Sequence, residues 1–163
     1  MHRAKLCGVD VPRIYFVDPK RSEIIMENIE GPLLKSITDG ANVKTNSSMA
    51  TLYRRLGKYC AMLHSVDIMH GDLTTKNVIV GDKRMVLLDF GLAFISSRLE
   101  DRAEDLHLLK QVIRSSFKSP RSAANIFAHA LLGYRSIAGE DFVRALCEQI
   151  AKIEKRGRYA RVD

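Results

Sequence analysis

The sequence His-Gly-Asp-Leu-Thr-Thr-Lys-Asn occupies residues 70–77, and Asp-Phe-Gly follows at residues 89–91. Two short apolar runs, at residues 78–80 and 85–88, lie between these motifs, and Gly-Asp-Lys-Arg separates the runs. Apolar and β-branched runs on either side of such a turn predict a β-hairpin. A hairpin of this length returns the chain to its starting point, so we expect Asp89 to lie close to Asn77.

The residues that this hairpin brings together are suited to binding a hard cation. Asn77 and Asp89 supply oxygen ligands, and Mg²⁺ takes few such ligands from protein while phosphates and water fill its other positions. Asp72, at the mouth of the same loop, is placed to orient or deprotonate an incoming hydroxyl or water. These are the parts that protein-kinase-like enzymes use in phosphoryl transfer. We therefore predict Asp72 as the catalytic residue and Asn77 and Asp89 as ligands of magnesium.

Composition indicates a globular protein with basic character. The 163 residues are 46% apolar, enough for one core, and the net charge is +7 with a pI near 9.5. Such charge permits a nucleic acid or another acidic partner, although a solvated basic surface is the commoner explanation. The three cysteines are far apart and lack zinc or disulfide spacing, which favours reduced thiols. With neither a signal peptide nor a membrane-spanning run in the sequence, we expect a soluble cytoplasmic or nuclear protein without membrane contact.

The N-terminal third predicts a helix end followed by two strands. Residues 1–6 are typical of the last turns of a helix, and residues 13–17 and 23–27 are typical of strands. The next residues, 28–32, contain Gly and Pro, which interrupt helices and strands. In a kinase-like fold this link joins the small lobe to the large lobe, and its backbone hydrogen-bonds to adenine. Glu27 and Ile29 are accordingly candidate nucleotide-binding residues, and an ordinary loop is the alternative interpretation.

Helical periodicity dominates the rest of the chain. Residues 49–66 form a predicted helix that leads directly to His70, and His64 on its apolar face is expected to be a packed core residue. Asp105, near the start of a later helix, has two interpretations: a first-turn residue favoured by the helix dipole, or a carboxylate that binds backbone N–H groups of the 70–77 loop. The preceding motif favours the second.

Two further helices are predicted from residues 119–120 and 140–141, and a basic segment closes the chain at residues 155–161. Segments of this kind are usually only solvated, and contact with the phosphate backbone of tRNA is the functional alternative.

These motifs together resemble the small atypical kinase subunits of the KEOPS (EKC) complex. The Thr-Thr pair within residues 70–77, Asp-Phe-Gly, and Glu-Asp-Arg-Ala-Glu-Asp-Leu at residues 100–106 carry the resemblance, which extends over essentially the whole chain. It implies an α+β, protein-kinase-like fold, ATP and Mg²⁺, Ser/Thr kinase activity toward some proteins, and an ATPase role in threonylcarbamoyladenosine modification of tRNA. Its implied partners are the transferase subunit and a small regulatory subunit of the complex.

Two features favour an ATPase or partner-regulated enzyme over a conventional signalling kinase. Gly71 stands where ordinary protein kinases carry an arginine that grips a phosphorylated activation loop. Only thirteen residues separate Gly91 from Asp105, and they contain no Ala-Pro-Glu. A phosphorylated loop would have nothing obvious to hold it, and a peptide substrate would have little docking platform.

The small lobe departs from the kinase pattern. Residues 1–13 contain no glycine-rich loop, and Lys5 lies in a predicted helix end rather than a strand. We therefore expect a fragment or a truncated gene model, with residues 1–31 as the remnant of the small lobe and hinge and residues 32–163 as the large lobe. ATP turnover by such a chain is expected to be impaired.

Three alternative functions fit parts of the same pattern. A RIO-type kinase uses related motifs, and so do small-molecule kinases of the aminoglycoside or choline type, whose helical insertions are longer. A binding module that holds partners through its large lobe without catalysis is the non-enzymatic alternative.

Overall fold

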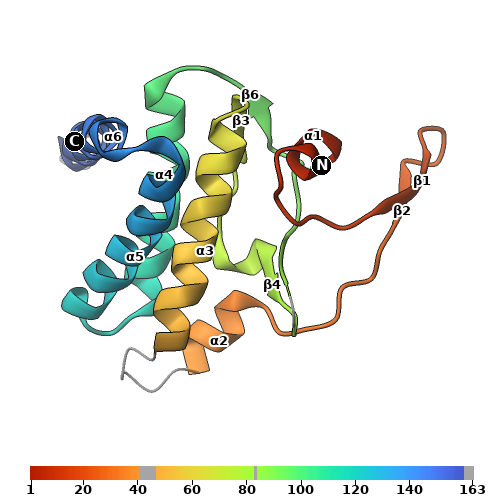
Figure 1. Cartoon of the computed structure of the whole chain (residues 1–163), viewed down its shortest axis with the longest axis horizontal. Helices are drawn as coiled ribbons and strands as arrows, with labels where there is room; N and C mark the ends of the chain where they lie inside the picture. Colours follow the sequence, from red (N-terminus) through yellow and green to blue (C-terminus); the bar gives the residue numbers. More distant parts are fainter. Residues whose placement is uncertain (41–46, 83, 160–163) are drawn as a thin grey trace.

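The structure, a computed structural model, describes residues 1–40, 47–82 and 84–159, and one β-hairpin extends from its helical body (Figure 1). This hairpin pairs β1 (Ile14–Asp18) with β2 (Glu23–Met26), antiparallel, with Asp18 opposite Glu23. Asp18 closes the turn because its Oδ1 accepts the N–H groups of Lys20 and Arg21, at 2.9 and 3.2 Å. The apolar side chains of both strands are exposed, Phe16 and Ile25 each to 56%.

Four long helices make the body: α3 (Ser47–His64), α4 (Leu99–Ser116), α5 (Pro120–Ala138) and α6 (Glu140–Tyr159). Figure 1 shows α3 beside α5, with α4 and α6 farther from the hairpin. Glycines set the α3–α5 approach. A Cβ on Gly57 would lie 1.8 Å from the carbonyl oxygen of Ala130, and one on Gly133 would lie 1.7 Å from that of Arg54. The two backbones therefore touch, and the core closes around Leu56, Ile126 and Leu146.

Short elements connect the body to the loop motifs. They are α2 (Leu34–Gly40), β3 (Ile68–Met69), the 3₁₀ turn η1 (Thr75–Asn77), β4 (Val78–Val80), β5 (Met85–Leu87) and β6 (Phe94–Ile95). β4 pairs with β5 in antiparallel register, Val78 opposite Leu87, and β3 pairs with β6. The hairpin predicted at residues 78–88 is confirmed; α2 and β6 were not predicted, because their sequences are too short to show a period.

The N-terminal segment packs on the helical body. Ala4, in α1 (His2–Leu6), is fully buried, and Val9 and Val11 are nearly so, in the same cluster as residues of α3 and β5. The backbone N–H of Leu87 donates to the carbonyl of Asp10 at 2.9 Å, which extends the β4–β5 pairing toward this segment. The predicted division at residue 31 stays a prediction.

The predicted helices are present with shifted ends. The 49–66 helix is α3, at residues 47–64, and the helices predicted from 119–120 and 140–141 are α5 and α6. Ser119 caps α5 by accepting the N–H of Ser122 at 3.4 Å, and Pro120 occupies the first turn. α6 continues through the basic segment as far as Tyr159, and residues 160–163 lie outside the described residues, as does most of the polar link before α3. None of the helices in the described ranges is long and apolar enough to cross a membrane.

Candidate active site

Asn77 fixes the conformation of the loop that carries Asp72. Its Nδ2 donates both to the backbone carbonyl and to the Oδ2 of Asp72, each at 2.9 Å. Only an NH₂ group is able to face two acceptors, so the Oδ1 of Asn77 points away from Asp72. No donor to that oxygen is recorded among the described residues. The amide thus holds the carboxylate and keeps one oxygen available as a ligand.

The β4–β5 hairpin brings Asp89 next to this pair, as predicted. The N–H of Leu88 donates to the carbonyl of Asn77 at 2.8 Å, so the residue just before Asp89 is bonded to Asn77 itself. Asp89 is exposed and has a left-handed backbone with φ of 51°, and its Oδ1 accepts the N–H of Gly91 at 3.0 Å. This turn presents the other carboxylate oxygen to solvent at the end of β5.

The donor set fits a magnesium ion better than a transition metal. Its members are the free oxygen of Asn77 and the carboxylate of Asp89, both hard ligands. Within the described ranges there is no group of three His, Cys, Asp or Glu side chains able to hold a metal. Mg²⁺ does not need such a group, because it is usually held by one or two carboxylates together with substrate phosphates and water.

His70 connects the loop to the strand before Asp89. The side chain is fully buried, its Nε2 lies 3.0 Å from the carbonyl of Leu88, and its Nδ1 lies 3.3 Å from the N–H of Asp72. A carbonyl only accepts and an N–H only donates, so the ring is neutral with its proton on Nε2. Burial lowers the pKa of His70, which agrees with this state. The ring also lies against Phe90, with centroids 4.8 Å apart.

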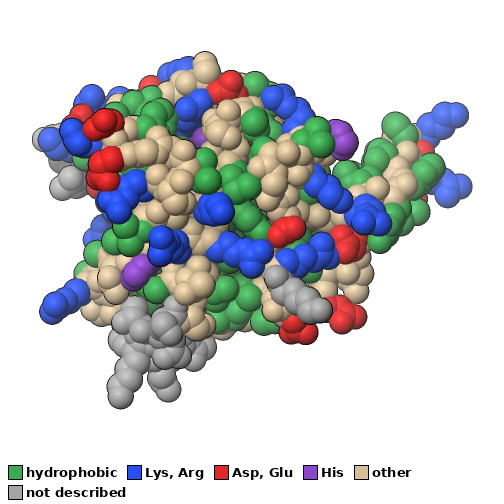
Figure 2. Space-filling model, viewed as in Figure 1, with side chains coloured by type: hydrophobic (Ala, Val, Ile, Leu, Met, Phe, Trp, Pro, Cys, Tyr) green, Lys and Arg blue, Asp and Glu red, His purple; other side chains and the backbone are tan. Residues whose placement is uncertain are grey.

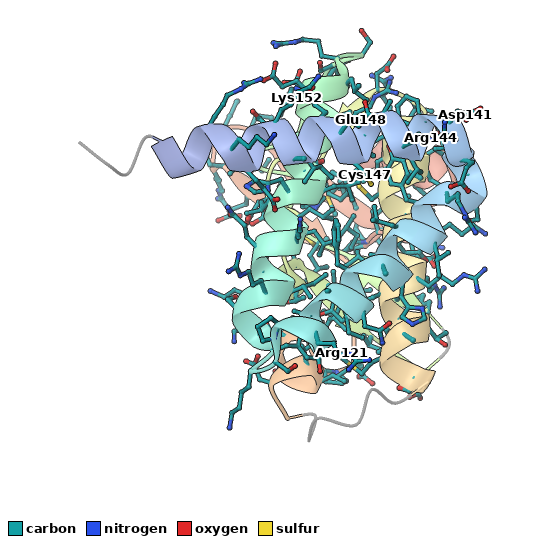
Figure 3. The ribbon with its side chains drawn as sticks, turned by 90° about the vertical axis from the view of Figure 1, so that its left-hand side faces the viewer. Arg121, Asp141, Arg144, Cys147, Glu148 and Lys152 are labelled. Carbon is teal, nitrogen blue, oxygen red and sulfur yellow. The ribbon has the colours of Figure 1, made fainter. Side chains whose placement is uncertain are left out.

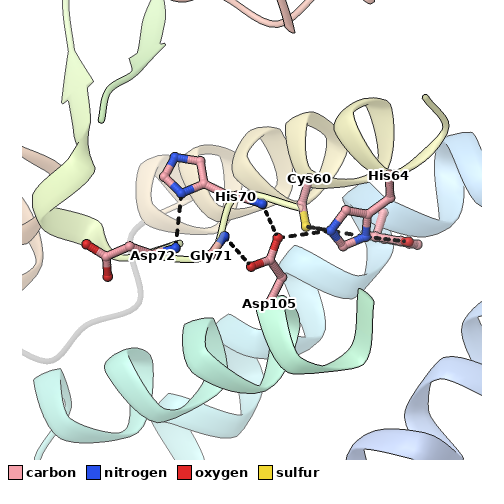
Figure 4. A network of polar contacts seen from close by, with 7 residues as sticks. Cys60, His64, His70, Gly71, Asp72 and Asp105 are labelled. Atoms are coloured by element: carbon pink, nitrogen blue, oxygen red, sulfur yellow. Dashed lines mark hydrogen bonds and ion pairs between the residues drawn. The ribbon is translucent and has the colours of Figure 1, made fainter. Parts of the chain in front are cut away.

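Asp105 holds the loop from behind (Figure 4). It extends from α4, and its carboxylate accepts the backbone N–H of His70 at 2.6 Å and that of Gly71 at 2.8 Å. Burial alone would raise its pKa, but hydrogen bonds from His64 and from these two amides outweigh burial and lower the pKa of Asp105. The predicted contact with the 70–77 loop is confirmed.

His64 extends this network, which sequence reasoning did not anticipate. Its Nε2 lies 3.2 Å from Asp105 and its Nδ1 lies 3.0 Å from the hydroxyl of Tyr134, while Cys60 contacts the ring 3.5 Å from Nε2. His64 is 1% exposed, which confirms it as a packed core histidine. The available signal was its position on the buried face of α3, and that position alone names no partner.

Position 71 has room only for glycine. Its φ is +78°, and a Cβ would lie 2.3 Å from the carbonyl oxygen of Leu92, in the segment that follows Asp-Phe-Gly. An arginine at this position would meet both obstacles. The loop therefore packs directly on the backbone of the following segment where ordinary kinases place a side chain.

The link after β2 is tied to the β4–β5 turn. The carboxylate of Glu27 accepts the N–H of Arg13 at 3.0 Å and forms an ion pair with Arg84, and these contacts lower the pKa of Glu27, the Arg13 N–H most strongly. Gly31 lies close to Val80: a Cβ on Gly31 would be 2.5 Å from the carbonyl oxygen of Val80. The backbone carbonyl of Glu27 and the N–H of Ile29 have no recorded hydrogen bond among the described residues. The structure does not bring these two residues into contact with Asp72, Asn77 or Asp89, so their nucleotide-binding role stays a prediction.

Comparison with known proteins identifies the family. Residues 1–115 match the family model described as RIO domain. A curated relative from Pyrococcus abyssi, "KEOPS complex subunit Bud32", is 38% identical over 98% of this chain and 70% of its own length. The chain belongs to the Bud32 family of RIO-domain proteins. The predicted resemblance to KEOPS subunits is confirmed, and the RIO-type alternative is supported to the extent of the RIO domain that residues 1–115 match.

Other Bud32-family relatives come from archaea and fungi. An "EKC/KEOPS complex subunit" of Schizosaccharomyces pombe is 30% identical over 93% of the chain and 63% of its own length. A "probable bifunctional tRNA threonylcarbamoyladenosine biosynthesis protein" of Methanosphaera stadtmanae is 34% identical, and the chain spans 26% of it. A solved structure titled "WaaP in complex with acyl carrier protein" superposes with a TM-score of 0.70 at 15% identity, covering 97% of this chain and 72% of that one. The α+β, protein-kinase-like fold is thereby confirmed.

Proposed function

We propose that this Bud32-family chain is an Mg-ATP-dependent phosphotransferase of the Ser/Thr kinase and ATPase type. The observation that carries the proposal is the joint placement of Asp72, Asn77 and Asp89. The amide of Asn77 holds the Asp72 carboxylate, the β4–β5 hairpin bonds the residue before Asp89 to the backbone of Asn77, and the buried Asp105 fixes the loop backbone. Phosphoryl transfer depends mainly on positioning and charge stabilisation, and such rigid support serves both.

Each residue has a proposed role. Asn77 and Asp89 hold magnesium, and Asp72 orients the attacking hydroxyl or water and accepts its proton. When bound, Mg²⁺ neutralises charge on the phosphates. The backbone at Glu27 and Ile29, both without recorded hydrogen bonds on the relevant atoms, accepts and donates to the adenine edge. Residues 1–31 then act as the hinge side and residues 32–163 as the large lobe.

The biological setting is inferred from the relatives' names. They are subunits of KEOPS or EKC complexes or tRNA threonylcarbamoyladenosine biosynthesis proteins. We infer the same tRNA modification for this chain, with the transferase subunit and a small regulatory subunit as partners, in the cytoplasm or nucleus. The glycine at residue 71 supports an ATPase role, because the loop has no arginine to read a phosphorylated segment.

Calorimetric titration with magnesium-ADP tests the roles. Asp89→Ala is expected to abolish binding, because the metal loses its only carboxylate ligand. Asp72→Ala is expected to bind normally and to lose about 10²–10⁴-fold of the ATP turnover of the parent, the range for a positioned base; the parent rate is itself expected to be slow, because residues 1–13 contain no glycine-rich loop. Asp82→Ala, which removes an exposed carboxylate from the β4–β5 turn, is the matched control and should change neither. Equal loss of binding in the Asp72 and Asp89 variants, or a parent that binds no magnesium-ADP, would contradict the assignment.

A further inference from the structure

A groove lies between the N-terminal segment, α3 and α5, outside the candidate active site. Gly8 and Asp10 line one side, Arg54, Arg55 and Lys58 of α3 line its centre, and Ser136 of α5 lines the other side. None of Asp72, Asn77 or Asp89 is part of its wall. Figure 2 shows Lys and Arg side chains gathered across the middle of this face, over α3.

The cations of the groove are only partly neutralised. Arg55 lies 3.4 Å from the carboxylate of Asp10 and 3.2 Å from the hydroxyl of Tyr59, so it is held within the wall. Tyr59 itself donates to Asp10 at 2.5 Å. Arg54 and Lys58 are exposed, lie one helical turn apart, and have no recorded ion pair among the described residues. Asp10 is thus already bonded to Arg55 and Tyr59, and Arg54 and Lys58 add two cations without a recorded ion pair to the same groove.

The groove lies where α3 and α5 are in backbone contact. Arg54 and Lys58 extend from α3 where its backbone touches that of α5, with the Cβ position of Gly133 within 3.0 Å of the backbone nitrogen of Lys58. Because Arg54 and Lys58 both belong to α3, their backbones are one helical turn apart, and the contact with α5 fixes where α3 sits in the fold. Ser136, Tyr59 and the small Gly8 and Gly133 complete the wall.

We propose that this groove binds the phosphate backbone of RNA, with Arg54 and Lys58 on neighbouring phosphates of one strand. Exposed, unpaired cations on a rigid support are the usual means of holding phosphates without reading sequence. The net charge of +7 favours such a polyanion. The choice of RNA rests on the proposed role in tRNA modification, and it adds a contact at the centre of the body to the one predicted for the basic C-terminal segment.

Fluorescence anisotropy with a labelled, unmodified tRNA transcript tests the proposal at several salt concentrations. The double variant Arg54→Ala/Lys58→Ala is expected to bind on the order of 30-fold more weakly at 0.1 M salt, and its plot of log affinity against log salt should be shallower by about 1.5–2. The double variant Arg121→Ala/Lys152→Ala removes equal charge from α5 and α6, on the face seen in Figure 3, and should weaken binding less than about threefold.

Two further measurements separate the possible failures. Arg54→Lys keeps the charge and is expected to retain RNA affinity. Urea unfolding of the Ala pair, followed by circular dichroism, should match the parent and verify that the variant is folded. Three results would refute RNA binding by the groove. They are equal RNA affinity in the parent and the Arg54/Lys58 variant, an equal loss in the control pair, and no RNA binding by the parent. If RNA binding depends on the groove but the protein binds no magnesium-ADP, the proposed enzymatic function is refuted and the proposed RNA-binding site is retained.

Discussion

Replacing Asp105 with asparagine removes one charge from the back of the 70–77 loop while keeping the shape of the side chain. The carboxylate accepts from the amides of His70 and Gly71 and from His64. An asparagine side chain has only one oxygen, so its NH₂ group must face at least one of these donors. Each buried donor left without an acceptor costs about 1–3 kcal/mol, and hydrogen bonds to a charged group contribute about 1.5–3 kcal/mol.

The expected loss of unfolding free energy for Asp105→Asn is therefore about 3 kcal/mol. For a chain of this length that corresponds to a fall of roughly 6–12 °C in Tm. Urea unfolding followed by circular dichroism measures the loss directly. Glu104→Gln changes the neighbouring carboxylate, which is exposed, and should stay within about 0.5 kcal/mol of the parent. A loss below about 1 kcal/mol for Asp105→Asn would refute the reasoning that these three donors depend on its charge.

Three further outcomes are expected. Burial lowers the pKa of His70, so the neutral ring stabilises the fold above pH 6.5, and this contribution is lost as pH falls through the lowered pKa. His70→Phe should therefore flatten this part of the curve of Tm against pH, and an unchanged slope would contradict the assignment of the pH dependence to His70. Gly71→Ala should cost about 1–3 kcal/mol in urea unfolding, because it meets both the positive φ and the Leu92 carbonyl, and a neutral effect would show that the segment yields. Phe16→Lys/Ile25→Lys should reduce concentration-dependent light scattering by covering an exposed strand pair with charge, whereas persistent scattering would place self-association elsewhere.

The parts of the fold that the sequence predicts are those with a local signal. The apolar period of α3, the Ser-Pro start of α5 and the turn between β4 and β5 each depend on neighbouring residues, and each is present. The carboxylate at residue 105 was assigned correctly only because the 70–77 motif supplied its partner. The expected place near a helix start alone would have suggested a first-turn acid; α4 begins at Leu99, and its first-turn acids are Glu100 and Asp101.

The contacts that sequence reasoning missed are long-range. Nothing local connects Arg84 with Glu27, or His64 with Tyr134, because each pair is brought together by the packing of elements far apart in the chain. The left-handed backbone at Asp89 and the contact of Gly71 with Leu92 depend on how two loops meet, which no periodicity encodes. The active-site roles themselves stay predictions.

The contact of α3 with α5 sets an order for folding during synthesis. Gly57 meets Ala130 and Gly133 meets Arg54, so about seventy-five residues separate the two sides of one interface. At ~5–20 residues per second, ribosomes need about 4–15 s to supply the second side. During that interval the apolar face of α3 has no α5 to pack against. The 70–77 loop, which follows α3, has then been synthesised before the helix that precedes it is packed. Chaperone binding is expected to concentrate on α3 in that interval and to end when α5 emerges.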